Sequence, residues 1–197
     1  MQAVRQGLRA LSAFALAVGL GAPAHATTLV RAGLGDLVAG NRTIVVGTVR
    51  SARSYWNEEH NFILTDVRLD VEEVLKGDAK ERDLTITILG GTVDDLTTVI
   101  VGGAELVAGK SYVLFLDRGD LPGVRNARTV RAHSQGVFEI VNTRDGLRAV
   151  SQASHQPLHP DALGSVDVPG KSQGLPLSSM VQSIREIAAR QGQREVK

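Results

Sequence analysis

The chain has 197 residues, and its 22 Lys and Arg residues nearly balance its 21 Asp and Glu residues. This balance argues against nucleic acid or an anionic membrane surface as the main partner, because both are bound through an excess of positive charge. The chain has no cysteine, which excludes disulfides and thiol catalysis. The hydrophobic core alone must hold the fold together.

The first residues have the pattern of an export signal. Arg5 and Arg9 precede an apolar run from Ala10 to Gly21, and Ala24-His25-Ala26 is typical of a cleavage site. The run is too short for a bilayer span, which needs about 20 apolar residues. We expect residues 1–26 to be a signal peptide. Its removal takes away two basic residues and no acidic one, so the mature chain has a net charge of −1. A bacterial periplasmic or secreted location fits an exported chain without cysteine.

A short helix is predicted near the mature N-terminus. It begins near Thr28, and Val30, Leu34, Leu37 and Val38 have the spacing of one helical face.

The segment after this helix has the pattern of short strands. Between Ile63 and Glu72, apolar residues alternate with Asp66, Arg68 and Asp70, as in a half-solvated antiparallel strand. Other runs are rich in β-branched residues and end at Gly, Asn or Asp turns. The predicted strands are Thr43–Arg53, Ile63–Glu72, Leu84–Leu89, Thr97–Val101, Tyr112–Asp117 and Gly136–Val141. Six strands without helices between them indicate an all-β barrel or sandwich over residues 27–150.

The rest of the chain differs in composition. Residues 151–176 are rich in Ser, Gln, His, Pro and Gly, which predicts an irregular polar strap or linker. Residues 177–197 read as an amphipathic helix capped by Ser178, with Met180 and Ile184 on its apolar face together with Ile187 and Ala188.

The strand segments carry a resemblance to a known family. The resemblance lies in Ile44-Val-Val-Gly-Thr-Val49, the strand entering Leu75-Lys76-Gly77, a Gly-Gly loop and Gly109-Lys-Ser-Tyr-Val-Leu-Phe115. These segments resemble the OB-like barrel of tissue inhibitors of metalloproteinases and netrin-type modules. They resemble still more closely the cysteine-free exported bacterial proteins with such a barrel. The resemblance implies an OB-like antiparallel β-barrel of five or six strands with a short N-terminal helix and a C-terminal helix. The inhibitors bind the protease zinc through an N-terminal cysteine, and here Thr27 stands at the expected N-terminus, so inhibition remains an analogy.

No catalytic motif fits its expected context. Ala104–Ser111 matches a loose phosphate-loop pattern, but a strand follows Gly109-Lys110-Ser111 where a helix is required. His133, Ser134 and Asp145 lack the Gly-x-Ser-x-Gly turn of a hydrolase. We therefore predict no catalytic residues.

Metal sites are also weakly indicated. His155, His159 and Asp161 offer three ligands in a Pro-rich stretch, short of a closed zinc site. Asp94 and Asp95 could bind calcium, but their spacing is not that of the calcium-binding helix-loop-helix, and a solvated turn is the simpler interpretation. We predict no metal and no cofactor.

Two loops are the candidate partner contacts. Tyr55, Trp56 and His60 cluster in the predicted turn Tyr55–Asn61, and Trp56 is the single Trp of the chain. Trp56 either closes the open end of a barrel or anchors a partner, because aromatic loop residues serve both purposes. The second loop is Gly90–Asp95, with Asp94 and Asp95 at its tip.

The sequence as a whole predicts an exported, non-catalytic binding module whose partner is another exported or envelope protein. A structural or assembly component of the envelope is the alternative, in which the strap and the C-terminal helix would be the working parts. A hydrolase with a site built from loops is the third possibility.

Overall fold

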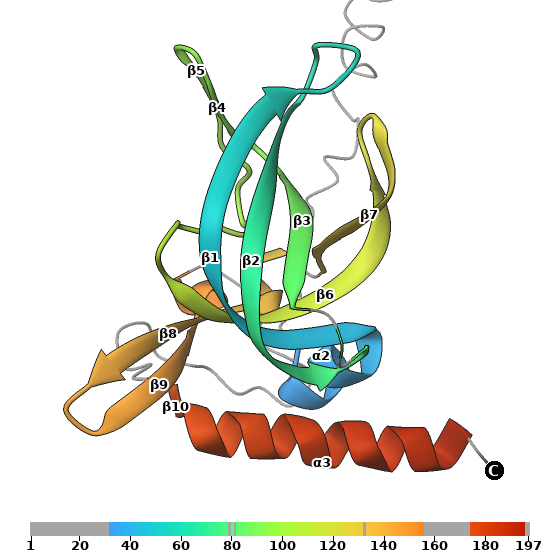
Figure 1. Cartoon of the computed structure of the whole chain (residues 1–197), viewed down its shortest axis with the longest axis vertical. Helices are drawn as coiled ribbons and strands as arrows, with labels where there is room; N and C mark the ends of the chain where they lie inside the picture. The colour runs from blue at the N-terminus through green and yellow to red at the C-terminus, as the bar shows by residue number, and fades with distance from the viewer. Residues whose placement is uncertain (1–31, 79, 81, 132, 156–173, 196–197) are drawn as a thin grey trace, which may run out of the picture.

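The computed structural model describes residues 32–78, 80, 82–131, 133–155 and 174–195 (Figure 1). The expected signal peptide and the expected helix start near Thr28 lie outside these residues. Within them, the fold is an antiparallel sheet of eight strands, a separate two-stranded hairpin and two α-helices. The all-β class is thus confirmed.

The elements of the described residues lie in the following order along the chain. They are α2 (Leu34–Gly40), β1 (Thr43–Trp56), β2 (Ile63–Lys76), β3 (Asp83–Leu89), β4 (Gly91–Val93), β5 (Leu96–Thr98), β6 (Ser111–Leu121), β7 (Val124–Val130), the 3-10 turn η1 (His133–Gly136), β8 (Val137–Thr143), β9 (Gly146–Ser151), the 3-10 turn η2 (Gln152–His155), β10 (Leu175–Pro176) and α3 (Leu177–Glu195).

Strand β1 is long and strongly bent. Its first half pairs with both β2 and β6, and its second half pairs with β2 alone. Three irregularities interrupt its ladder with β2, and such bulges bend a strand. Gly47 lies at one of them, where a Cβ atom would be 2.6 Å from the carbonyl oxygen of Asp70. A glycine is therefore needed for the close approach of the two backbones.

The main sheet does not close on itself through hydrogen bonds. Its order is β10-β9-β8-β6-β1-β2-β3, and β7 pairs with the second half of β6. β3 and β7 come close to each other, but no ladder joins them in the described part of the chain. The main sheet thus has eight strands where five or six were expected, and the predicted barrel closure is not confirmed among the described residues.

Two hydrophobic cores lie on opposite faces of this sheet. The first fills the hollow between the curved strands, and its largest fully buried residues are Leu69, Leu84, Ile86, Tyr112, Leu114 and Leu116. The second lies between the sheet and the helices, and it is formed by Leu37, Val38, Ile44, Val46, Leu75, Val113, Phe115, Ala149, Met180 and Ile184. Alternate residues of β1 and β6 enter the two cores, as strand geometry requires.

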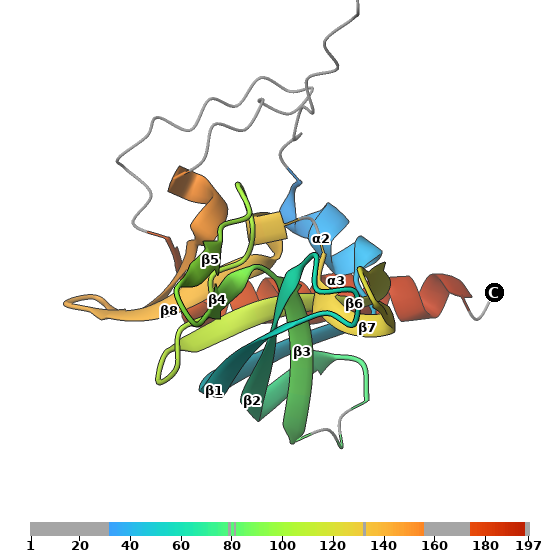
Figure 2. The same ribbon diagram turned by 90° about the horizontal axis from the view of Figure 1, so that it is seen from above.

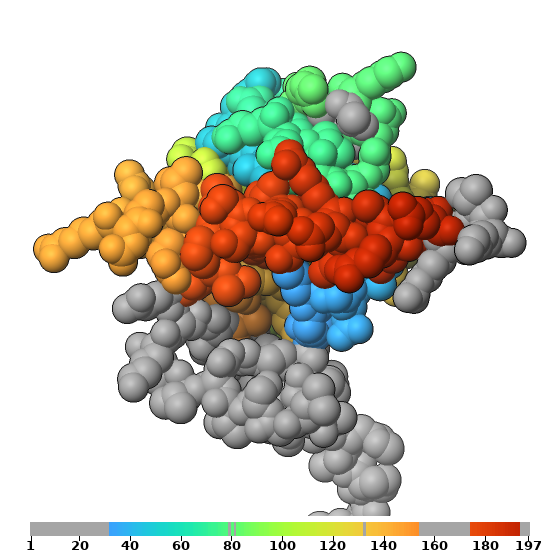
Figure 3. Space-filling model, turned by 90° about the horizontal axis from the view of Figure 1, so that it is seen from below, coloured from blue at the N-terminus to red at the C-terminus, as the bar shows by residue number. Residues whose placement is uncertain are grey.

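Helix α3 covers the lower face of the sheet. Figure 3 shows it lying between α2 and β2, with β8 and β9 beside its first turns. Met180 and Ile184 are buried, which confirms the predicted apolar face. Two polar contacts join the helix to β2: Arg185 pairs with Glu73, and the Lys76 Nζ atom donates to the Gln191 side chain at 3.3 Å.

Several predicted boundaries are wrong. Tyr55 and Trp56 belong to the end of β1 and not to the turn, because the β1–β2 ladder continues to the pair Trp56–Ile63. The predicted strand Thr97–Val101 ends at Thr98, because β5 has only the short β4 to pair with. The expected strap contains η2 at its start and β10 near its end, and its middle lies outside the described residues. β7 and β9 were not predicted.

Candidate functional site

Tyr55 and Trp56 end β1, and His60 lies in the loop that follows. The Trp56 and His60 rings are stacked, with centroids 6.4 Å apart and planes inclined by 16°. His60 has a φ of 53°, which few residues other than glycine adopt. The Tyr55 hydroxyl donates to the Asp66 carboxylate at 3.2 Å. Partial burial and the charge of Asp66 raise the pKa of Tyr55. The three predicted contact residues are thus partly held by one another and by β2.

The β1–β2 loop is fixed by one buried side chain. The carboxamide oxygen of Asn57, a residue only 3 % exposed, accepts the backbone N–H groups of Asn61 and Phe62 at 3.0 Å each. Its Nδ2 atom donates to the Asn61 side chain at 2.8 Å. Residues 57–62 therefore form an ordered loop that presents exposed His60 and Phe62 to solvent.

Asp94 and Asp95 form the turn of the β4–β5 hairpin, and both are exposed. The base of this hairpin packs on the end of β1, where the Thr92 N–H donates to the Ser54 hydroxyl at 3.3 Å. Gly91 lies so close to Ser54 and Thr65 that no Cβ atom fits. The structure therefore places the base of the second predicted contact loop beside the first, at the same end of the sheet (Figures 1 and 2).

An exposed apolar segment adjoins these loops and was not predicted as a contact. Leu96, Val99, Val101 and Val107 are 58 %, 74 %, 93 % and 50 % exposed. Isolated exposed aliphatic side chains are ordinary on protein surfaces, but four within twelve residues are a concentrated apolar surface. We call Leu96–Val107 the apolar segment. Its signal in the sequence is a run of aliphatic residues around Gly102-Gly103 without strand alternation.

Two cavities lie along the apolar segment. The larger, of about 430 Å³, opens between β3, β7 and residues 100–104, where β3 and β7 lack a ladder. The smaller, of about 330 Å³, lies between the apolar segment and the ends of β1 and β3. Both are lined by Ile88, Leu89, Ile100, Gly103 and Ala104. None of the predicted contact residues lines either cavity.

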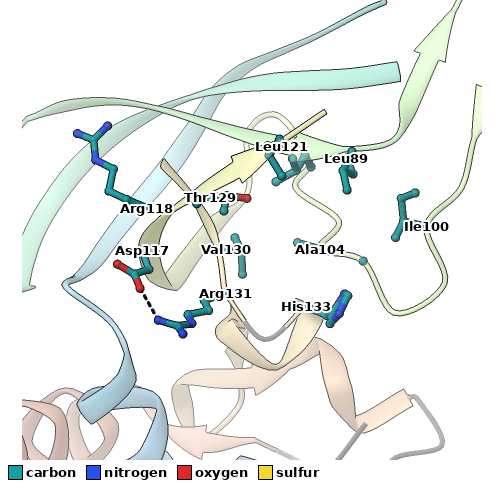
Figure 4. Close-up of a pocket in the computed structure, with 13 residues that line it drawn as sticks. Leu89, Ile100, Ala104, Asp117, Arg118, Leu121, Thr129, Val130, Arg131 and His133 are labelled. Atoms are coloured by element: carbon teal, nitrogen blue, oxygen red, sulfur yellow. Dashed lines mark hydrogen bonds and ion pairs between the residues drawn. The ribbon is translucent and has the colours of Figure 1, made fainter. Parts of the chain in front are cut away.

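Charged groups gather at one side of the larger cavity, as Figure 4 shows. The Asp117 carboxylate, only 10 % exposed, accepts an N–H group of Arg131 at 2.5 Å and lies 3.4 Å from Nε of Arg42. Arg131 donates through the same Nη1 atom to the Gly40 carbonyl at 3.2 Å. Arg118 points away from the other lining residues, and His133 lies at the opposite side. The cavity thus has an aliphatic wall and a charged margin formed by the Asp117–Arg131 pair.

The other motifs form no site among the residues that the structure describes. Gly109, with a φ of +83°, lies in the turn before β6, so a strand follows the phosphate-loop pattern as expected. The Lys110 ammonium group is paired with Glu139 at 2.8 Å. Ser134 is buried and its backbone N–H donates to the Gly102 carbonyl, whereas Asp145 is exposed in the β8–β9 turn. His159 and Asp161 lie outside the described residues. No cluster of three His, Asp or Glu residues suited to a metal ion occurs within the described ranges.

Comparison with protein-family models and with curated proteins found no match to this chain. Among the residues that the structure describes, neither α2 nor α3 has both the length and the apolar character that a membrane-spanning helix requires.

Proposed function

We propose that the chain is an exported binding module, without catalytic activity of its own, that contacts a protein partner through the apolar segment and the two loops beside it. The observation that carries the proposal is the concentration of exposed Leu96, Val99, Val101 and Val107 beside an ordered aromatic loop. Exposed apolar surfaces of this kind mark interaction sites, because their burial against a partner is favourable.

An OB-like origin of the fold is part of this proposal. Strands in the order β3-β2-β1-β6-β7, with the first and last strands close together, support a five-stranded, partly open barrel to which β8, β9 and β10 are added. Protease inhibition remains an analogy of fold, since the chain has no cysteine to bind a protease zinc.

The alternatives draw less support. An assembly role for a free C-terminal helix is disfavoured because Met180 and Ile184 of α3 are buried in the second core. A loop-built hydrolase would need a nucleophile near a base, and Ser134 has its hydroxyl buried without a hydrogen-bond partner in the described part of the chain.

Affinity capture from an envelope extract tests the proposal. Val99→Asp with Val101→Asp should abolish capture of the partner, because two charges would enter an apolar interface. Leu147→Asp is the matched control, since Leu147 is equally apolar and 52 % exposed but lies on the β8–β9 hairpin. Trp56→Ala adds the aromatic loop to the test. Equal capture by all variants would refute the proposed surface. If only Trp56→Ala lowers the stability of the protein, the Trp56 ring has a structural role at the end of the sheet.

A further inference from the structure

Gly119 lies at the wall of the larger cavity, beside an irregularity in the β6–β7 ladder. Gly119 lies in β6 without the positive φ that favours glycine. A Cβ atom there would meet nothing closer than the Thr129 methyl group at 3.9 Å. A glycine inside a strand is destabilising relative to alanine, because it loses more backbone freedom on folding. Gly119 therefore gives up stability and leaves space at the wall of the cavity.

The lining of this cavity suits an aliphatic chain. Its apolar lining is Ile88, Leu89, Ile100, Leu121 and Val130 together with the small residues Gly103, Ala104 and Gly119. The polar and charged lining residues are Asp117, Arg118, Thr129, Arg131 and His133. The residues lining it include no Phe, Tyr or Trp. A volume of about 430 Å³ falls within the range of small-molecule sites, which are mostly apolar with a few polar groups.

The margin of the cavity suits an anion. Asp117 already accepts from Arg131 and lies beside Arg42, so its charge is compensated within the protein. Among the described residues, the bonds of Arg131 to Asp117 and Gly40 both use Nη1, and a guanidinium group has further N–H donors on Nη2 and Nε. Guanidinium groups bind carboxylates through two parallel hydrogen bonds.

We propose that this cavity binds a single aliphatic chain with an anionic head group, such as a fatty-acid carboxylate. The chain would lie between β3 and β7 against Gly119, and the carboxylate would lie at Arg131. This proposal does not depend on the protein partner proposed above. Ile100 lines the cavity, but its neighbours Val99 and Val101 do not, so different substitutions test the cavity and the exposed valines.

Isothermal titration with monomeric dodecanoate tests the site. Gly119→Val should weaken binding by about tenfold or more, because its side chain occupies the space of several methylene groups. The same variant should keep or raise the urea midpoint of unfolding, since a β-branched residue replaces glycine in a strand. Gly35→Val is the matched control: no atom lies within 4 Å of a Cβ built at Gly35, which is on α2, and binding should be unchanged.

The head group is tested separately. Arg131→Gln should weaken dodecanoate binding and leave dodecanol binding unchanged. Equal binding of dodecyltrimethylammonium would overturn the anionic assignment. Three results would refute the site. One is equal dodecanoate binding by Gly119→Val and the unchanged protein, and another is no dodecanoate binding at about 1 mM, a concentration that detects even very weak affinity. The third is a protein that binds phosphatidylglycerol vesicles but no monomeric dodecanoate.

Discussion

Gly123 lies beside the Asn57 side chain: a Cβ atom added at Gly123 would be 3.2 Å from Cβ of Asn57. The β1–β2 loop thus lies beside the β6–β7 turn, which is far from it in sequence. The buried carboxamide of Asn57 also accepts two backbone N–H groups of its own loop. The ordering of the β1–β2 loop, one part of the candidate partner surface, therefore depends on this one side chain.

Replacing Asn57 by alanine should lower the free energy of unfolding by about 1–3 kcal/mol, because the partly buried N–H groups of Asn61 and Phe62 lose their acceptor. Urea denaturation followed by Trp56 fluorescence measures this loss. Asn142→Ala, at an exposed position of β8, should change the midpoint little. An equal effect of the two changes would show that the Asn57 hydrogen bonds contribute no special stability.

Gly91 and Gly109 both have positive φ values, of +131° and +83°, but their surroundings differ. A Cβ atom at Gly91 would collide with the Ser54 and Thr65 hydroxyl groups, whereas none of the surrounding atoms lies within 4 Å of a Cβ at Gly109. Gly109→Ala should cost about 1 kcal/mol from backbone strain alone. Gly91→Ala should lower the melting temperature clearly more, since packing strain is added. Similar melting temperatures for the two variants would contradict the close packing of β4 on β1.

Ile184 is completely buried between α3 and the sheet. Ile184→Ala should reduce stability by about 2–5 kcal/mol through lost burial and the cavity left behind. Gln182→Ala, on the exposed face of the same helix, is the control and should have little effect. A small loss for Ile184→Ala would mean that α3 is not firmly docked, and it would revive the assembly role for this helix.

Both tyrosines of the chain have raised pKa values in the folded state. For Tyr112 the main cause is burial, which disfavours the phenolate. The folded pKa lies above the unfolded value of about 10, so the unfolded state loses its proton first and stability falls as the pH rises above about 10. Tyr112→Phe should reduce this alkaline loss, and denaturation midpoints measured from about pH 8 to pH 11 would show it. A parallel decline in both proteins would assign the loss to other groups.

The sequence pattern predicted the regular elements and not the site. Alternation in Ile63–Glu72 and the apolar face around Met180 depend on local periodicity, so both were recognised correctly. β7 was missed because Arg125, Asn126 and Arg128 hide its pattern. The larger cavity could not be predicted, since its lining comes from β3, β6, β7 and the 100–104 loop, which only tertiary structure brings together.

Strand β1 links the two hydrophobic layers of the molecule. Val45 and Val49 pack in the hollow of the sheet, while Ile44 and Val46 pack under the helices. Neither hydrophobic layer can unfold without disrupting the other, because residues 44–49 of β1 contribute side chains to both layers. The helical layer and the curved sheet should therefore unfold as one cooperative unit, with coincident transitions in circular dichroism and fluorescence.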